Sequence, residues 1–319
     1  RLRSDDNAIS PACNIFDIFN TSLTQPLASV STGSVDFSYD LSGVAGVAHG
    51  ITFEYSTDGG TTWIVDNTNV SGDLAGVLPG VGLAITWDTA SVFTGNMPNV
   101  RVRLTTDDLA VSPVSAPFDV INTEISKPLV SPTLFSTAIT YDLTSASGTA
   151  RNIVLEYSLD GGATWTPDSN ISGDITGVLP GTGHSITWDT GAAFSLNQFN
   201  VNIRLRTDDN ALSPSSDPFD VLNTILNQPS HHHIVLGAIE VTFNLTGVAG
   251  ITHNLELDYT LDGGLTWIND PNITGATTNV LPGVGLTITW DTTISFPGNL
   301  NGVQTRLRTD DGAISPASD

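Results

Sequence analysis

The chain has 319 residues, of which 33 are acidic and only 10 are basic, so its formal net charge is −23. This charge excludes a binder of nucleic acid or anionic membrane that works through a basic surface, because both partners would be repelled. Charged residues are only 13 % of the chain and apolar residues are 39 %, which excludes a charge-rich disordered tail. The single cysteine, Cys13, excludes an intrachain disulfide. No apolar run reaches the length of about 18 residues that a membrane span needs, so we expect no inserted segment.

Three motifs recur along the chain with a period of about 102 residues. The segment EYSTDGGTTW begins at Glu54 and returns in related form from Glu156 and Asp258. A second motif, ITWDT, follows it in each period, and after that a third, RLRxDD, which has the longer form RVRLTTDD in the first period. The third motif also opens the chain, at Arg1. We therefore expect residues 1–19 to be the closing strands of a preceding repeat, followed by repeats at 20–121, 122–222 and 223–319, the last without its final strand.

In chain order, the first full repeat alternates apolar and polar residues in short runs, which is typical of β-strands. Such runs lie at 51–55, 83–88 and 100–104, and turn-forming residues separate them at 58–60 and 78–80. No stretch has a helical period. About seven short strands in each hundred residues, each with one apolar face, predict an all-β chain of tandem antiparallel β-sandwiches.

The ordered set YSTDGGTTW, LPG, TWDT, RVRLTTDD and PFDV resembles the immunoglobulin-like and fibronectin type III-like repeats of large prokaryotic secreted or cell-surface proteins. The resemblance covers essentially the whole chain. It implies a stalk, adhesin, matrix or filament component outside the cell, and it implies no catalytic residue. We therefore expect a protein that is not an enzyme.

The segment from Ser56 to Trp63 also fits the S-x-D-x-G-x-T-W pattern of the Asp box. We interpret it as a stabilising hairpin in which the aspartate caps backbone donors, with a ligand site as the alternative. The second tryptophan series continues the apolar parity of its strands, which predicts core positions rather than sugar-stacking ones. This series consists of Trp87, Trp188 and Trp290.

Eight of the nine arginines form R-x-R pairs, and the period of a strand places both members of a pair on the outer face. The neighbouring strand carries Glu54, Glu156 or Asp258, so we expect cross-strand ion pairs. A binding stripe is the alternative interpretation.

An aspartate doublet ends each R-x-R strand, and two adjacent carboxylates repel each other. A hard cation with oxygen ligands would relieve this repulsion, so we hypothesise a calcium site, with a solvated turn as the alternative. The candidate ligands are Asp107, Asp108, Asp208, Asp209, Asp310 and Asp311. We expect no other cofactor. The tract His231–His233 is interpreted as a linker variation, with a metal site as the alternative.

N-glycosylation sequons fall at the same place in each repeat, at Asn69, Asn170 and Asn272, and make glycosylation a hypothesis.

The sequence predicts an extracellular structural protein that forms a stalk, fibre, filament or sheath. Its partners would be copies of itself joined head to tail, or adjoining repeats of a longer chain. The alternative is an adhesin whose repeats bind glycan or protein. Segment 13–20 matches the final strand that the last repeat lacks, so it could complete an open sandwich, either by ordinary continuation of the chain or by donor-strand exchange between separate polypeptides. Continuation is favoured, because the fragment also repeats the preceding RLRSDD strand, which exchange would leave redundant. Its apolar residues are Ile15, Phe16, Ile18 and Phe19.

Overall fold

The computed structural model describes residues 1–11, 14 and 18–319, apart from the side chains of residues 233 and 234. The chain divides into two compact units. The first comprises Arg1–Glu124 and Thr144–Thr149, and the second comprises Ile125–Leu143 and Ala150–Asp319. One hydrophobic core lies in the first unit and two lie in the second, so that each repeat has a core of its own.

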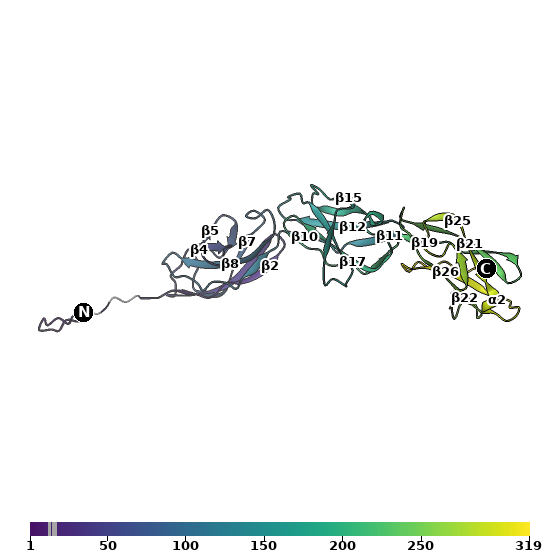
Figure 1. Cartoon of the computed structure of the whole chain (residues 1–319). Coiled ribbons are helices and arrows are strands. Elements are labelled where there is room, and N and C mark those ends of the chain that lie inside the picture. Colours follow the sequence, from purple (N-terminus) through teal and green to yellow (C-terminus); the bar gives the residue numbers. More distant parts are fainter. Residues whose placement is uncertain (12–13, 15–17) are drawn as a thin grey trace. The chain divides into compact units, whose positions relative to one another are not determined.

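The first repeat is a sandwich of a five-stranded and a four-stranded antiparallel sheet. The larger sheet has the order β1-β3-β7-β6, and β2 also pairs with β3; the smaller has the order β5-β4-β8-β9 (Figure 1). The strands are β1 (Ser22–Leu23), β2 (Leu27–Ser31), β3 (Ser34–Ser42), β4 (Ile51–Ser56), β5 (Ile64–Val65), β6 (Val70–Gly72), β7 (Gly80–Asp88), β8 (Met97–Thr106) and β9 (Phe118–Val120).

The second repeat has the same topology, with sheets β10-β12-β16-β15, in which β11 pairs with β12, and β14-β13-β17-β18. One helical turn follows β16 and begins at an aspartate cap, Asp189. The elements are β10 (Thr123–Ile125), β11 (Leu129–Thr133), β12 (Ser136–Ser145), β13 (Ile153–Ser158), β14 (Thr166–Asp168), β15 (Ile171–Gly173), β16 (Gly181–Asp189), α1 (Thr190–Ala193), β17 (Gln198–Thr207) and β18 (Phe219–Val221).

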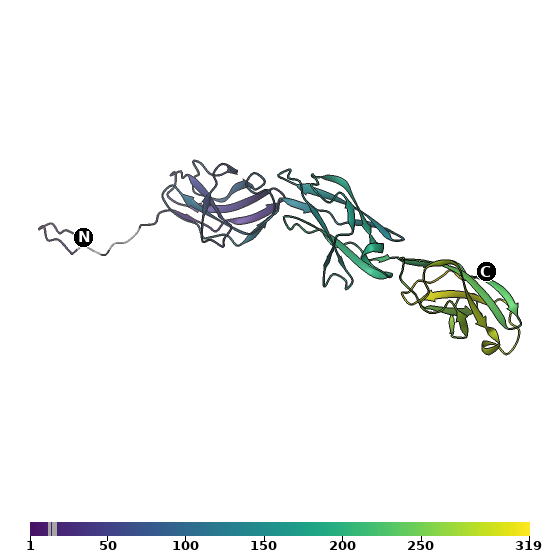
Figure 2. The ribbon, with the colours of Figure 1, turned by 45° about the horizontal axis from the view of Figure 1, so that its top comes forward.

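The third repeat has sheets β19-β21-β25-β24, with β20 paired to β21, and β23-β22-β26. The second of these sheets has three strands, because the described chain holds no counterpart of β9 or β18 after β26. The third repeat is the green-to-yellow part of the ribbon (Figure 2). The elements are β19 (Thr224–Leu226), β20 (Ser230–Val235), β21 (Ala238–Gly247), β22 (Leu255–Thr260), β23 (Ile268–Asp270), β24 (Ile273–Gly275), β25 (Gly283–Asp291), α2 (Thr292–Ser295) and β26 (Gln304–Thr309).

The all-β sandwich predicted from the alternating pattern is confirmed. Its strand number is higher than the expected seven: nine in each of the first two repeats and eight in the third, counted over the described residues. The additional strands are mostly two or three residues long, such as β5 and β6, and so short a run has no recognisable period. The helices of the described chain are the single turns α1 and α2, and neither could cross a membrane.

The strand parity read from the sequence also places the core correctly. Trp87, Trp188 and Trp290 are 0 %, 0 % and 2 % exposed, as predicted. In the first repeat, the ring centroids of Phe53 on β4 and Trp87 on β7 lie 5.2 Å apart, so the aromatic side chains join the two sheets. Burying side chains of this size supplies much of the stability of a sandwich that has no disulfide.

Candidate functional site

The aspartate doublets lie directly after β8, β17 and β26, in the turn that leaves each strand. In the first repeat, the Nδ1 atom of buried His49 lies 3.1 Å from an Oδ1 atom of Asp107. The neighbouring Asp108 accepts a hydrogen bond of 2.5 Å from the hydroxyl of Thr21, in the segment that precedes β1. The doublet therefore contacts both a buried imidazole and the entry of the chain into the repeat.

The other two doublets face a side chain from the same position of the fold. In the second repeat this is Arg151, whose guanidinium lies 3.1 Å from an Oδ2 atom of Asp209. In the third repeat it is His253, whose side chain is 0 % exposed. The three residues are structurally equivalent, because each forms an isolated bridge with the valine of the VLPG loop, namely His49 with Val77, Arg151 with Val178 and His253 with Val280.

Sequence reasoning identified the doublets but missed their partners. A signal was present, because His49, Arg151 and His253 each precede the first aspartate of their doublet by 57 or 58 residues. Every repeat has at this position a side chain that can carry a positive charge. It is a histidine in the first and third repeats and an arginine in the second. Calcium at the doublets remains a hypothesis.

Hydrogen bonds keep the doublets in their carboxylate form. The backbone amide of Gly50 and the His49 side chain lower the pKa of Asp107, and the hydroxyls of Thr106 and Thr21 lower that of Asp108. For Asp311, burial raises the pKa, but hydrogen bonds from Thr224 and Thr309 outweigh it and the pKa is lowered. Asp107, Asp108 and Asp311 are therefore negative at neutral pH and can attract a cation.

The arginine pairs form the expected cross-strand ion pairs. In the second repeat, Arg204 and Arg206 donate from Nε to Glu156 over 2.7 and 2.8 Å. The guanidinium of Arg204 also lies 4.4 Å from the ring of Trp165, a cation–π contact that sequence reasoning missed. Glu156 is only 6 % exposed, so this acid is buried beneath its arginines rather than free on the surface.

The third repeat repeats this stack with Asp258, Arg306 and Trp267. In the first repeat, Glu54 has Arg103 as its ionic partner, and Thr105 stands where the second and third repeats have another arginine. The R-x-R pair of the first repeat is thus shifted by two residues along its strand.

The Asp-box segments are hairpins whose aspartate is used by the hairpin itself, as predicted. Asp160 accepts hydrogen bonds from the backbone and hydroxyl of Thr164 and from the hydroxyl of Ser158. The Thr164 bonds come first among the causes that lower its pKa to about 2. Asp58 and Asp262 sit in equivalent hairpins. The carboxylates have few lone pairs left for a ligand.

The sequon asparagines contact a second set of aspartates. Asn170 donates its side-chain amide to Asp168 over 2.8 Å, and Asp168 also accepts from Nε1 of the core residue Trp188. Asn69 and Asn272 make the same contact in their repeats. These asparagines therefore have a structural role, and their glycosylation remains a hypothesis.

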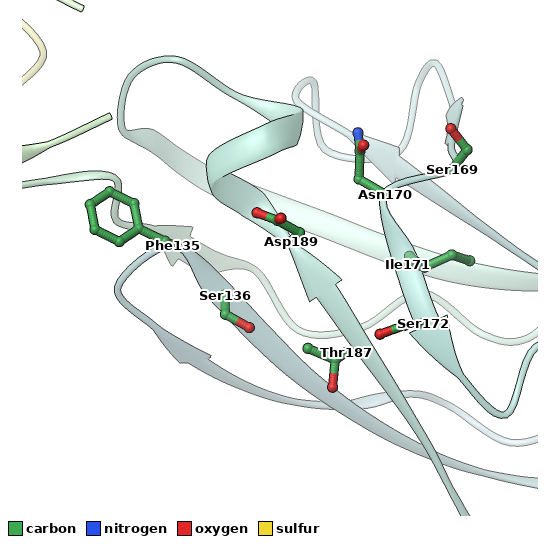
Figure 3. A pocket seen from close by; sticks show the side chains of 8 residues that line it. All are labelled: Phe135, Ser136, Ser169, Asn170, Ile171, Ser172, Thr187 and Asp189. Atoms are coloured by element: carbon green, nitrogen blue, oxygen red, sulfur yellow. The ribbon is translucent and has the colours of Figure 1, made fainter. Parts of the chain in front are cut away.

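A surface pocket of about 560 Å³ lies beside Asn170 (Figure 3). Phe135 is at one side, and the rest of the lining is mainly polar. Phe135 has a φ of +64°, whereas the equivalent turn positions in the other repeats hold Gly33 and Gly237. A bulky residue in this left-handed conformation is unusual and strained.

The remaining candidates from the sequence are the strand-complementation residues, Cys13 and the histidine tract. Ile15 and Phe16 lie outside the described residues, as does Cys13. Ile18 and Phe19 belong to no strand and are 74 % and 83 % exposed. The histidine tract lies on β20, where His231 Nε2 is 2.7 Å from the hydroxyl of Thr305.

The strand order and the three separate cores decide the architecture. The chain is a tandem array of immunoglobulin-like and fibronectin type III-like β-sandwiches.

No protein-family model matches the sequence, and no curated protein does. Similar solved structures include domains FN1–FN3 of chicken CNTN1, at 12 % identity over 93 % of this chain and 97 % of that one, with a TM-score of 0.23. The three N-terminal domains of the bacteriophage RB49 highly immunogenic outer capsid protein (Hoc) match at 10 % identity over 94 % and 97 %, with a TM-score of 0.28.

Proposed function

We propose that this chain is part of an extracellular, non-enzymatic structural array, a stalk, fibre, filament or sheath built from its repeats. The supporting observation is that each repeat uses its chemically versatile side chains internally. One tryptophan of each repeat is in the core and the other lies under an arginine. The VLPGVG, VLPGTG and VLPGVG loops hardly differ, whereas a binding array would gain from varied loop tips.

We further propose head-to-tail joining by strand complementation. In the first two repeats, β9 and β18 cover the edges of β8 and β17 with Val120 and Val221, which are 0 % and 1 % exposed. The corresponding edge of β26 has no such partner among the described residues. Ile18, which matches those valines in sequence, is 74 % exposed. An edge strand without a partner and an exposed apolar segment of matching sequence are complementary.

Sedimentation velocity of the purified chain over a range of concentrations tests this joining. We expect concentration-dependent oligomers whose formation is abolished by Ile18→Asp. The matched control is Val81→Asp, which places the same charge at another exposed apolar position, 85 % exposed on β7, and should leave assembly intact. A chain that stays monomeric at all concentrations, or an Ile18→Asp variant that assembles normally, would contradict strand exchange between chains.

An adhesin is the second candidate, and the pocket beside Phe135 is the observation that favours it. An aromatic ring held next to hydroxyls and an amide is a common way to bind a sugar ring. If the strained Phe135 serves such a ligand, Phe135→Gly, which copies the first and third repeats, should abolish binding on a glycan array and preserve stability. An array without any glycan signal for the unaltered chain would reject this candidate.

A further inference from the structure

The carboxylates of Asp310 and Asp311 converge on one nitrogen of a buried histidine that has no hydrogen-bond partner. His253 is 1 % exposed, and neither of its ring nitrogens donates or accepts a hydrogen bond. Its Nδ1 atom lies 3.7 Å from Asp310 Oδ1 and 3.6 Å from Asp311 Oδ1. These separations exceed the range of about 2.7–3.2 Å for a hydrogen bond to nitrogen.

The same separations suit two ligand atoms that share a metal ion. Zinc bonds to histidine nitrogen and carboxylate oxygen are about 2.0–2.2 Å long, which places the ligand atoms of a tetrahedral site about 3.4 Å apart. The candidate ligand atoms of His253, Asp310 and Asp311 all lie within 4.8 Å of one another. Three protein ligands would leave a fourth position for water, and Asp310 is 45 % exposed, which gives the ion a route of entry.

The remaining oxygens of the two carboxylates are already fixed by other groups. Asp310 Oδ2 accepts from the side-chain amide of Asn254 over 3.0 Å. Asp311 Oδ2 accepts from the hydroxyl of Thr224 over 2.6 Å and from the backbone amide of Asn197 over 3.2 Å. Outer hydrogen bonds of this kind orient metal ligands. They also connect the site to β19, through Thr224, and to the loop before β17 of the preceding repeat, through Asn197.

The second repeat provides an internal comparison. At the equivalent position it carries Arg151, whose fixed positive charge pairs with Asp209. The first repeat carries His49, which satisfies Asp107 with a contact of hydrogen-bond length, 3.1 Å. In the third repeat no guanidinium faces the doublet. Asp311 Oδ1 accepts a hydrogen bond from the hydroxyl of Thr309 over 2.5 Å, but neither carboxylate is hydrogen-bonded to His253.

We propose that His253, Asp310 and Asp311 form a binding site for a borderline divalent cation such as Zn²⁺. An imidazole ligand favours zinc and its transition-metal neighbours, whereas calcium prefers a shell made of oxygens alone. The bound ion supplies the positive charge that Arg151 supplies one repeat earlier. It also ties the turn after β26 to the segment before β22, which carries His253.

Isothermal titration of the full chain with zinc chloride tests the site. The background variant carries His231→Gln, His232→Ser and His233→Thr, so that the histidine tract does not contribute. We expect zinc binding in this background and a rise in its melting temperature that a chelator reverses. His253→Arg, which copies the arrangement of the second repeat, should weaken zinc binding more than about tenfold, at least the effect of losing an outer-sphere partner.

His184→Gln is the matched control, because His184 is also partly buried but faces one carboxylate only, with Nδ1 3.9 Å from Asp174. It should leave zinc binding unchanged. No zinc binding in the background variant, zinc binding that survives His253→Arg, or loss of binding with His184→Gln would overturn the proposal. Calcium binding that is indifferent to His253→Arg, in a chain that does not bind zinc, would return the doublets to the calcium hypothesis.

Discussion

At the scale of single residues, the acids that pair with the arginines of β17 and β26, Glu156 and Asp258, are buried although they lie on an outer face. Glu156 illustrates this arrangement, because two arginines cover it and one of them stacks on Trp165. The alternating pattern correctly predicted that the arginines of the R-x-R strand pair with this acid. It could not predict the burial of the acid, because the alternation along one strand does not show that the Asp-box tryptophan, Trp165, packs against the arginine that pairs with Glu156.

Replacing this acid should destabilise the second repeat. Glu156→Gln removes the charge that Arg204 and Arg206 share, and we expect a loss of about 1–3 kcal/mol in the free energy of unfolding. A fully buried pair would lose about 3–5 kcal/mol, but these arginines are 26 % and 33 % exposed and can be rehydrated. Urea unfolding with hydrogen exchange read on β13 and β17 measures the change.

The control for this substitution is Asp217→Asn. Asp217 pairs with Lys127 over 2.7 Å, but it is 86 % exposed, so we expect a change of about 0–1 kcal/mol. Equal losses for the two variants would show that the burial of Glu156 contributes nothing.

The Asp-box hairpins should make stability depend on pH in the acid range. The pKa of Asp160 falls from 3.8 in the unfolded chain to about 2 in the hairpin, so the unfolded state binds more protons between these values. Its contribution is therefore complete above pH 4 and is lost as the pH falls through about 2. Asp160→Asn should lower stability at pH 7 and make the second repeat less sensitive to acid over this window. Melting curves of the full chain from pH 2 to pH 7 test this, and unchanged acid sensitivity would contradict it.

The side chains that face the aspartate doublets could not be predicted from the sequence. His49, Arg151 and His253 differ in type, and each lies 57 or 58 residues before its doublet in the chain, so only the folded sandwich brings them within 4 Å of the aspartates. The tryptophan cores were predictable because parity along one strand is a local property. Contacts between strands that are more than 50 residues apart are not.

At the scale of secondary-structure elements, three of the short strands, β6, β15 and β24, end at a glycine. β15 ends at Gly173, with a φ of +104°, and a Cβ atom there would lie 2.4 Å from the carbonyl oxygen of Ser185 on β16. Only glycine permits so close an approach of two strands. Turn glycines such as this one are visible in the sequence, but the partner backbone that excludes a Cβ atom is not.

Gly173→Ala should therefore separate β15 from β16. We expect the free energy of unfolding to fall by more than the roughly 1–3 kcal/mol that is typical of backbone strain alone. Strain alone is the effect expected for the control. The control is Gly177→Ala, at a φ of +61° with no atom within 4 Å of the added Cβ. Urea unfolding of the full chain, with hydrogen exchange read on β15, compares the two. Equal destabilisation by both substitutions would mean that the close approach of the strands is unimportant.

At the scale of the whole molecule, the repeat organises both the fold and the charge. Each period contains one core, one Asp-box hairpin and one arginine-covered acid, so the architecture could be predicted from the 102-residue period alone. The net charge of −23 is spread over all repeats, and most of the arginines that could offset it are already paired with acids of their own repeat. Two copies that meet head to tail therefore bring surfaces of the same sign together.

The proposed assembly should for this reason become stronger with salt. Repulsion between copies is screened over about 10 Å at 0.1 M salt and over about 3 Å at 1 M, whereas the burial of Ile18 against the β26 edge is apolar and is not weakened by screening. Sedimentation velocity of the chain at low and high sodium chloride should show larger oligomers at high salt. Ile18→Asp should remain monomeric in both, which separates specific joining from general salting out. Oligomers that dissociate as salt rises would instead point to ion pairs as the force that joins the copies, and would contradict an apolar strand as the joint.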